Sequence, residues 1–293
     1  MHPSLTIYKQ QSVDFINRDF ELQTLTADCL FTEGPVWNKN GYYLFSDITA
    51  NCIYKISEEG SKEIFLHHSG TDDPLDPDIK QDQAGSNGLA FLGDKLLICQ
   101  HGSHAIALLQ GQGPDVFLNS YKGRPFNSPN DIVVHSNGSI YFSDPPYGLK
   151  GGKLNPQKFQ PIAGVYVARE KEIELICDRY QYPNGVCFSP GEKILYICSN
   201  KEFEKFISMY DVVSGKFMGI LAEENSDGIE TDSSGNVYLC SKEGLIILNN
   251  NGERLALLEL PAIPSNCCWG GERGKDLFIT ARASVYLVKD FLR

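Results

Sequence analysis

Residues 226–241, SDGIETDSSGNVYLCS, show the pattern on which the chain is built. A polar residue, Asp227, precedes a short apolar run, a turn follows at 233–235, and a run rich in β-formers comes next. A glycine followed by strand-forming residues and a small polar residue recurs at intervals of roughly 40 to 50 residues. These glycines are Gly41, Gly93, Gly138, Gly191, Gly235 and Gly274. The period predicts an all-β fold, a six-bladed β-propeller.

An oxygen-bearing side chain stands six to eight residues before each of these glycines. The six are Glu33, Asn87, Asn130, Asn184, Asp227 and Asn266. Because the innermost strands of a propeller line its central channel, we expect these side chains to converge on one axis. An Asn or Asp before Gly is common in turns, but Glu is a poor turn residue, which favours a shared site. Such oxygens predict a divalent cation in the channel, most simply Ca²⁺, with Mg²⁺, Mn²⁺ or Zn²⁺ as alternatives.

The 293 residues and 42 % hydrophobic content predict one propeller domain spanning residues 1–293. Its ring is expected to close with an outer strand from the segment before Phe31. The net charge of −11 argues against a nucleic-acid partner. No apolar run is long enough for a membrane span and no signal peptide is visible, so we expect a cytoplasmic, bacterial protein without a membrane partner. Nine cysteines without a CxxC motif predict buried free thiols rather than a zinc site. The oligomeric state stays open.

Further strands are expected outside the inner pairs, and two long loops separate some of them. The outer strands are expected at 51–56, 62–66, 104–109, 164–167, 173–177, 207–212, 245–248 and 254–260, with another at 283–288. Loops 67–85 and 147–161 are either lids or surface excursions. The Asp-rich loop 67–85 does not match an EF-hand, and the absence of G-x-S-x-G argues against a Ser-His-Asp triad.

Several motifs resemble one known family. They are FTEGPVW at 31–37, NSPNDIVV at 127–134, YFSDPPYG at 141–148, YPNGVCFSP at 182–190, SDGIETDSSGNVY at 226–238 and SNCCWGG at 265–271. Over about residues 31–287 the chain is similar to the gluconolactonase branch of the SMP-30/gluconolactonase/luciferin-regenerating-enzyme family. The resemblance implies a six-bladed propeller with a divalent cation held by Glu33, Asn184 and Asp227. It also implies that Asn130 binds the cation or contacts the substrate. In the regucalcin-like branch an arginine contacts the substrate where Ser128 stands here.

By resemblance, the expected function is metal-dependent hydrolysis of a small-molecule sugar lactone, with Asp227 as general base for the attack of metal-activated water on the carbonyl. Candidate substrate contacts at the channel mouth are Asn87, His101, Asn130 and Tyr147. Two alternatives stay open. The same metal site suits an organophosphate or other ester, or the chain is a calcium-binding propeller without enzymatic activity.

Overall fold

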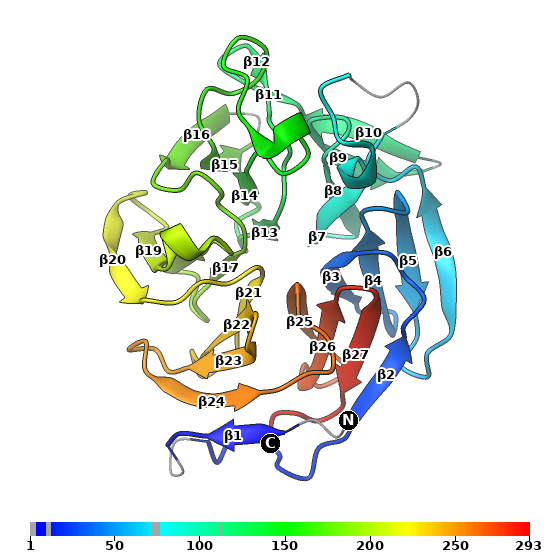
Figure 1. Ribbon diagram of the computed structural model, residues 1–293, viewed down its shortest axis with the longest axis vertical. Helices are drawn as coiled ribbons and strands as arrows, with labels where there is room; N and C mark the ends of the chain where they lie inside the picture. Colours follow the sequence, from blue (N-terminus) through cyan, green and yellow to red (C-terminus); the bar gives the residue numbers. More distant parts are fainter. Residues whose placement is uncertain (1–3, 10–12, 72–76, 112, 171) are drawn as a thin grey trace.

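The repeated unit of the sequence is one antiparallel sheet, and six such sheets stand around a central axis (Figure 1). The computed structural model describes residues 4–9, 13–71, 77–111, 113–170 and 172–293. Within these residues, five of the six sheets have four strands and one has five. The all-β, six-bladed propeller predicted from the period is therefore confirmed.

The two innermost strands of each sheet correspond to the two halves of the repeated unit. The innermost strands, each beginning within two residues of a predicted polar residue, are β3 (Thr32–Asn38), β7 (Ser86–Leu92), β13 (Ile132–Val134), β17 (Val186–Phe188), β21 (Ile229–Thr231) and β25 (Asn266–Gly270). Their neighbours are β4 (Tyr42–Asp47), β8 (Lys95–Gln100), β14 (Ile140–Asp144), β18 (Ile194–Ile197), β22 (Val237–Ser241) and β26 (Asp276–Ala281). The pairs are antiparallel, so the second strand ends on the face where the first begins.

The outer strands complete the sheets, and all of those expected are found within two residues of their predicted ends. The third strands are β5 (Cys52–Ile56), β9 (Ala105–Gln110), β15 (Gly164–Arg169), β19 (Ile207–Asp211), β23 (Gly244–Leu248) and β27 (Ser284–Val288). The fourth are β6 (Lys62–His67), β10 (Gly113–Leu118), β16 (Glu172–Cys177), β20 (Phe217–Ala222) and β24 (Arg254–Leu258). Sequence reasoning missed β10, which begins Gly-Pro-Asp, and β20, which Gly219 interrupts, because these residues weaken a strand pattern.

The ring closes by bringing the two ends of the chain together (Figure 1). Strand β2 (Leu22–Thr26) pairs with β27 as the outermost strand of the last sheet, as the sequence led us to expect. Strand β1 (Leu5–Ile7) adds a fifth strand to the preceding sheet by pairing with β24. A short ribbon of β11 (Ser120–Tyr121) and β12 (Arg124–Pro125) stands outside the six sheets. Neither β1 nor the ribbon was predicted.

The hydrophobic core lies mainly between neighbouring sheets, where inner strands of one blade pack on those of the next. The rings of Tyr43 in β4 and Phe278 in β26, for example, stack with centroids 4.1 Å apart across the closure. All nine cysteines are buried free thiols, as predicted. In the described part of the chain, no helix is long and apolar enough to cross a membrane.

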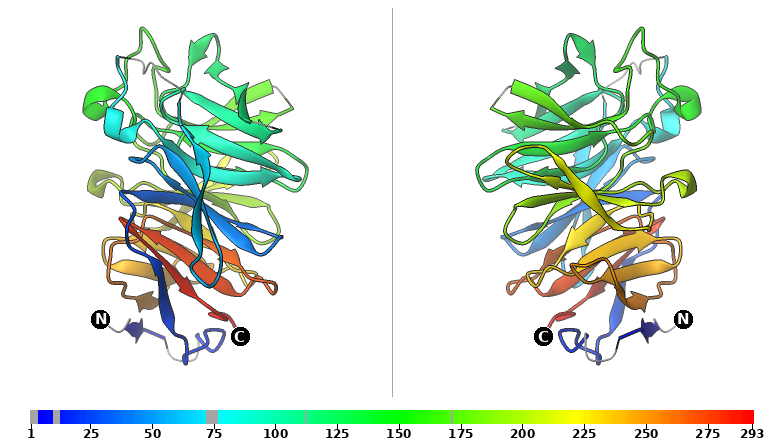
Figure 2. Two further views of the ribbon diagram at one scale, coloured as in Figure 1. Left: turned by 90° about the vertical axis from the view of Figure 1, so that its right-hand side faces the viewer. Right: turned by 90° about the vertical axis from the view of Figure 1, so that its left-hand side faces the viewer.

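The two long loops predicted separately contact each other. Ile79 and Leu149 form an isolated β-bridge, and the Lys80 amide donates to the Gly148 carbonyl at 2.8 Å. An ion pair of 2.9 Å joins Lys158 to Asp78. The acidic residues at 72–76 of the first loop lie outside the described residues. Three short helical turns, η2 (Gln81–Gln83), η3 (Lys150–Gly152) and η4 (Glu202–Glu204), project from one face of the ring (Figure 2, cyan, green and yellow-green).

Candidate active site

Neighbouring blades meet closely at the positions of the predicted polar residues. The Gly185 amide donates to the Asp227 carbonyl at 2.9 Å, and the Gly88 amide donates to the Asn130 carbonyl at 2.7 Å. A Cβ on Gly185 would lie 2.8 Å from the Asp227 carbonyl oxygen, and one on Gly88 would lie 2.6 Å from the Asn130 carbonyl oxygen. Glycine follows these polar residues because a side chain would hold the blades apart. The Asn-Gly and Asp-Gly pairs are thus sites of blade contact.

Glu33 and Asp227 bring two carboxyl groups into electrostatic contact across the ring. Burial raises the pKa of the Glu33 carboxyl well above its usual range, and the charges of Asp227 and Asp131 raise it further. Burial also raises the pKa of Asp227, to about 6, against the opposing effects of hydrogen bonds from Asn200 and Asn184. The raised pKa of each group indicates that no positive charge nearby is sufficient to stabilise its ionised form. A divalent cation supplies such a charge.

The Asp227 carboxylate is held by two side chains of the preceding blade, which in turn contact Tyr147 of the blade before it. Asn200 Nδ2 donates to Asp227 Oδ1 at 2.8 Å, and Asn184 Nδ2 donates to the same oxygen. The Tyr147 hydroxyl donates to Asn200 Oδ1 at 2.9 Å and lies 3.3 Å from Asn184 Nδ2. Four side chains therefore form one network that fixes the orientation of Asp227. The structure brings together three of the predicted site residues, Tyr147, Asn184 and Asp227.

The loop carrying Tyr147 is itself anchored at the end of β14. Asp144 accepts hydrogen bonds from the backbone amides of Asn127 and Ser128, each at 2.8 Å. The Ser128 hydroxyl donates to the Pro145 carbonyl and accepts from the Gly148 amide at 3.0 Å. Ser128, which stands where the regucalcin-like branch has its arginine, is fully buried. Its contacts therefore hold the loop on both sides of Tyr147.

The remaining predicted residues lie in the ring or beside it. Asn87 and Asn130 are 3 % and 4 % exposed at the channel ends of their blades. His101 is fully buried below the first long loop, with Nδ1 3.1 Å from the Gln83 carbonyl oxygen. Burial lowers its pKa to about 4. In the described part of the chain, His101 makes no hydrogen bond to the Asp227 network, and its Nε2 has no hydrogen-bond partner.

A cavity of about 420 Å³ opens beside Asp227, between the last three blades. It is lined by Asn200, Lys201, Glu202, Phe203, Asn225, Ser226, Asp227, Cys240, Ser241, Lys242, Ile263, Pro264 and Arg282. Sequence reasoning did not single out Asn200, Lys201 or Arg282. All three lie in turns that follow second strands, on the face where the inner strands begin. The antiparallel pairing of the repeat is the signal that could have found them.

The donor set fits a hard cation. Among the described residues, no three His, Cys, Asp or Glu side chains gather as a metal site. The candidate ligands are instead two carboxylates, Glu33 and Asp227, with the side-chain amide oxygens of Asn130 and Asn184. An all-oxygen set of this kind is typical of Ca²⁺, Mg²⁺ and Mn²⁺.

A second cavity, of about 430 Å³, lies between the innermost strands of the six blades. Its lining is largely apolar and includes Trp37 and Trp269, together with the carboxyl groups of Asp131 and Glu230. Burial raises the pKa of Asp131 to about 6 and that of Glu230 to about 7. The Val186 amide donates to Asp131 Oδ2 at 2.9 Å. Asp131 therefore binds an inner strand of the next blade.

Fold and site together define a six-bladed propeller whose polar side chains gather where the inner strands begin. The chain belongs to the SMP-30/gluconolactonase/LRE-like family, whose model matches residues 31–283. It is 32 % identical to a gluconolactonase from Zymomonas mobilis, over 92 % of this chain and 81 % of that protein. The family predicted from the motifs is confirmed.

Two solved structures share the fold. A gluconolactonase from Xanthomonas campestris aligns with a TM-score of 0.83 and 24 % identity, over 100 % of this chain and 95 % of that chain. A calcium-binding protein, regucalcin, from Agrobacterium tumefaciens aligns with a TM-score of 0.73 and 16 % identity, over 93 % of this chain and 95 % of that chain.

Proposed function

We propose that this protein is a lactonase that opens a sugar lactone, with a divalent cation in the channel and Asp227 as the general base. The carrying observation is the Asp227 carboxylate, which lines a cavity of about 420 Å³ while two asparagine amides hold one of its oxygens. The identity to the Zymomonas gluconolactonase supports a lactone as the substrate. No nucleic acid or membrane has a role in this proposal.

The two oxygens of Asp227 have different roles. Oδ1 accepts both amide hydrogen bonds, from Asn184 and Asn200. In the described residues no hydrogen bond reaches Oδ2, so Oδ2 is the oxygen that takes a proton from an attacking water. Tyr147 keeps Asn200 in place through its hydroxyl. General-base assistance of this kind contributes about 10²–10⁴-fold to the rate.

The residues that would hold the cation are Glu33, Asn130, Asn184 and Asp227. When bound, the cation would polarise the lactone carbonyl and acidify the attacking water. Calcium is the first candidate because its coordination tolerates a mixed ring of carboxylates, amides and water. The calcium-binding regucalcin of the same fold supports this choice. Mg²⁺, Mn²⁺ and Zn²⁺ are the alternatives.

The alternative substrate on the same site is a phosphotriester, and the identity to the Zymomonas gluconolactonase favours a sugar lactone over it. The cavity combines polar side chains, such as those of Asn200 and Asn225, with a larger apolar surface that includes Phe203 and Ile263. Asn87, Asn130, His101 and Tyr147 remain predicted substrate contacts.

The test is hydrolysis of glucono-δ-lactone, followed with a pH indicator, before and after EDTA treatment and after each of the four cations is restored. We expect chelation to abolish hydrolysis and one cation to restore it. Asp227→Asn should then lower kcat by about 100-fold or more, because the amide cannot accept the proton. Cation binding is measured separately by calorimetry. Full activity of a cation-loaded Asp227→Asn variant would refute the general base, and a folded protein inactive with every cation would favour another ester or a binding role.

A further inference from the structure

We propose that the lactone bound by this protein carries an anionic group, a phosphate or a carboxylate, and that Lys201 and Arg282 bind this group. The inference rests on the lactonase function proposed above and names the substrate class of that site. Lys201 follows β18 in one blade, and Arg282 lies in the turn between β26 and β27 two blades further on. Both line the cavity beside Asp227, which belongs to the blade between them.

Lys201 is held in position by two aromatic rings. Its Nζ lies 4.7 Å from the ring centre of Tyr182 and 5.0 Å from that of Tyr147, at distances of cation–π contact. In the described part of the chain no carboxylate forms an ion pair with Lys201. Partial burial lowers the pKa of its ammonium group. The protein therefore keeps a cation at the cavity wall at a desolvation cost, as an anion-binding group requires.

Arg282 supplies the second cation from the opposite side. Its guanidinium carbon lies 5.2 Å from the ring centre of Phe31, and Arg282 is an exposed residue that lines the cavity. Among the described residues it too has no ion-pair partner. An unpaired guanidinium presents a planar fork that suits phosphate and carboxylate oxygens.

The charge of Asp227 alone does not account for the presence of both Lys201 and Arg282 at this cavity. Each lowers the pKa of the Asp227 carboxyl, but a divalent cation between Glu33 and Asp227 would already balance those two carboxylates. Lys201 and Arg282 then leave the cavity with positive charge, in a chain whose net charge is −11. Lys242, a third cation of the same lining, differs because it is paired with Glu202 at 3.0 Å.

The test compares kcat/KM for glucono-δ-lactone, its 6-phosphate and a glucaric acid lactone, which carries a carboxylate. The wild type should prefer at least one anionic lactone by about tenfold or more, since charge-assisted hydrogen bonds are lost with the neutral one. Lys201→Met and Arg282→Gln should each reduce this preference by about tenfold. The matched control, Lys242→Met, should leave the preference unchanged. If Lys201→Met does not fold, Arg282→Gln still tests the inference, because Arg282 is exposed and its replacement should leave the fold intact.

Equal losses on neutral and anionic lactones in both variants would overturn the inference, as would a wild type without preference. Calorimetry of 6-phosphogluconate binding to EDTA-treated protein separates this inference from the proposed function. Binding that depends on Lys201 and Arg282, in a protein that opens no lactone, would retain the anion site and reject lactonase activity. Hydrolysis of the neutral lactone without preference or anion binding would retain lactonase activity and reject the anion site.

Discussion

At the scale of single residues, the Tyr147 hydroxyl is linked to the Asp227 carboxylate through Asn200. That hydroxyl bonds to Asn200, and Asn200 bonds to Asp227. Tyr147→Phe should lower kcat on glucono-δ-lactone by about tenfold, because Asn200, whose amide group orients Asp227, loses the hydroxyl that donates to its Oδ1. Tyr182→Phe is the control, since its hydroxyl donates to the Gly152 carbonyl and its ring remains. Equal effects of the two substitutions would show that the Tyr147 hydroxyl does not position the base.

A substitution at Gly185 tests whether the close approach of neighbouring blades is the reason that glycine follows Asn184. An added Cβ would lie 2.8 Å from both the Asp227 carbonyl oxygen and the Ile229 amide nitrogen. Gly185→Ala should therefore destabilise the fold by about 1–3 kcal/mol, the usual cost of overpacking. Gly191→Ala is the control, since its Cβ would meet nothing within 4 Å. Urea unfolding measures both, and a neutral Gly185→Ala would show that the blades separate easily.

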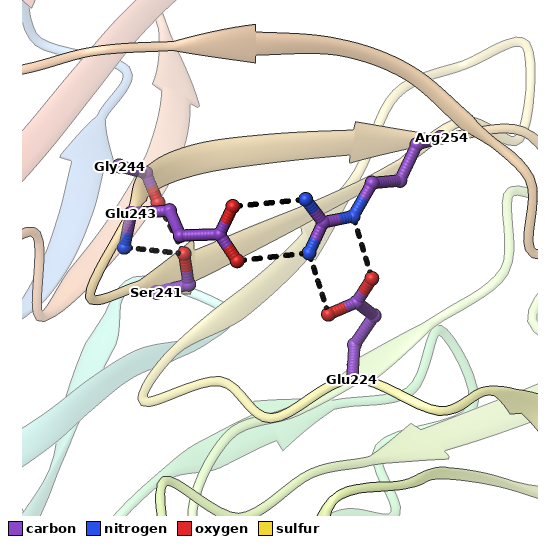
Figure 3. A network of polar contacts seen from close by, with 5 residues as sticks. All are labelled: Glu224, Ser241, Glu243, Gly244 and Arg254. Carbon is purple, nitrogen blue, oxygen red and sulfur yellow. Dashed lines mark hydrogen bonds and ion pairs between the residues drawn. The ribbon is translucent and has the colours of Figure 1, made fainter.

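At the scale of elements, one arginine connects strands and turns of neighbouring blades (Figure 3). Arg254, at the start of β24, donates to Glu224 at 2.6 and 2.9 Å and to Glu243 through two bonds of 2.9 Å. Glu224 lies in the connection from β20 to β21, and Glu243 lies in the turn between β22 and β23. The Ser241 hydroxyl accepts from the Glu243 amide at 3.1 Å and donates to the Gly244 carbonyl. The network thus ties the fourth strand of its sheet to the segment that leads to Asp227.

Replacing Arg254 should loosen this connection. Arg254→Met should lower the free energy of unfolding by about 1–2 kcal/mol, because the Glu224 side chain, 13 % exposed, loses its partner. Arg254→Lys should restore little, since an ammonium group cannot bond both carboxylates in a fork. Lys39→Met breaks the exposed pair with Asp94 and should cause no measurable change. Thermal unfolding of the three variants checks this order, and full rescue by lysine would contradict the bidentate interpretation.

At the scale of the whole molecule, a channel cation would join blades that are far apart in sequence. Glu33 comes from the first sheet and Asp227 from the fifth. Because the pKa of Asp227 rises to about 6 on folding, the metal-free folded chain holds a proton that the unfolded chain releases above about pH 4. Stability from this carboxyl is therefore fully present below about pH 4 and is lost as the pH rises through about 6.

A cation should reverse this pH dependence, because it binds the ionised carboxylate. We expect the rise in Tm caused by the active cation to be larger at about pH 7.5 than at about pH 5. Differential scanning calorimetry with EDTA or cation at both pH values measures the effect. Asp227→Asn removes one titrating ligand and should reduce the difference. Equal shifts of Tm at both pH values would argue against a site built on Asp227.

The local sequence pattern was sufficient to predict the six blades. Strand alternation and turn glycines depend on residues close in sequence, so their repetition predicted six sheets and the polar ring. Ring closure also followed, since the N-terminal segment before Phe31 was expected to supply β2. The outermost strands β10 and β20 escaped prediction because their glycines and Pro114 weaken the same signal. The motifs also predicted the family.

The partners within the site depended on tertiary structure. Tyr147, Asn200 and Asp227 belong to three successive blades, and no local pattern relates them. The two long loops were predicted singly, but their contact through Ile79 and Leu149 depends on how the second and third blades stand together. The sequence repeat predicts the strands and turns within each blade. The contacts between blades, which orient Asp227 and bring Lys201 and Arg282 to one cavity, arise only when the ring assembles.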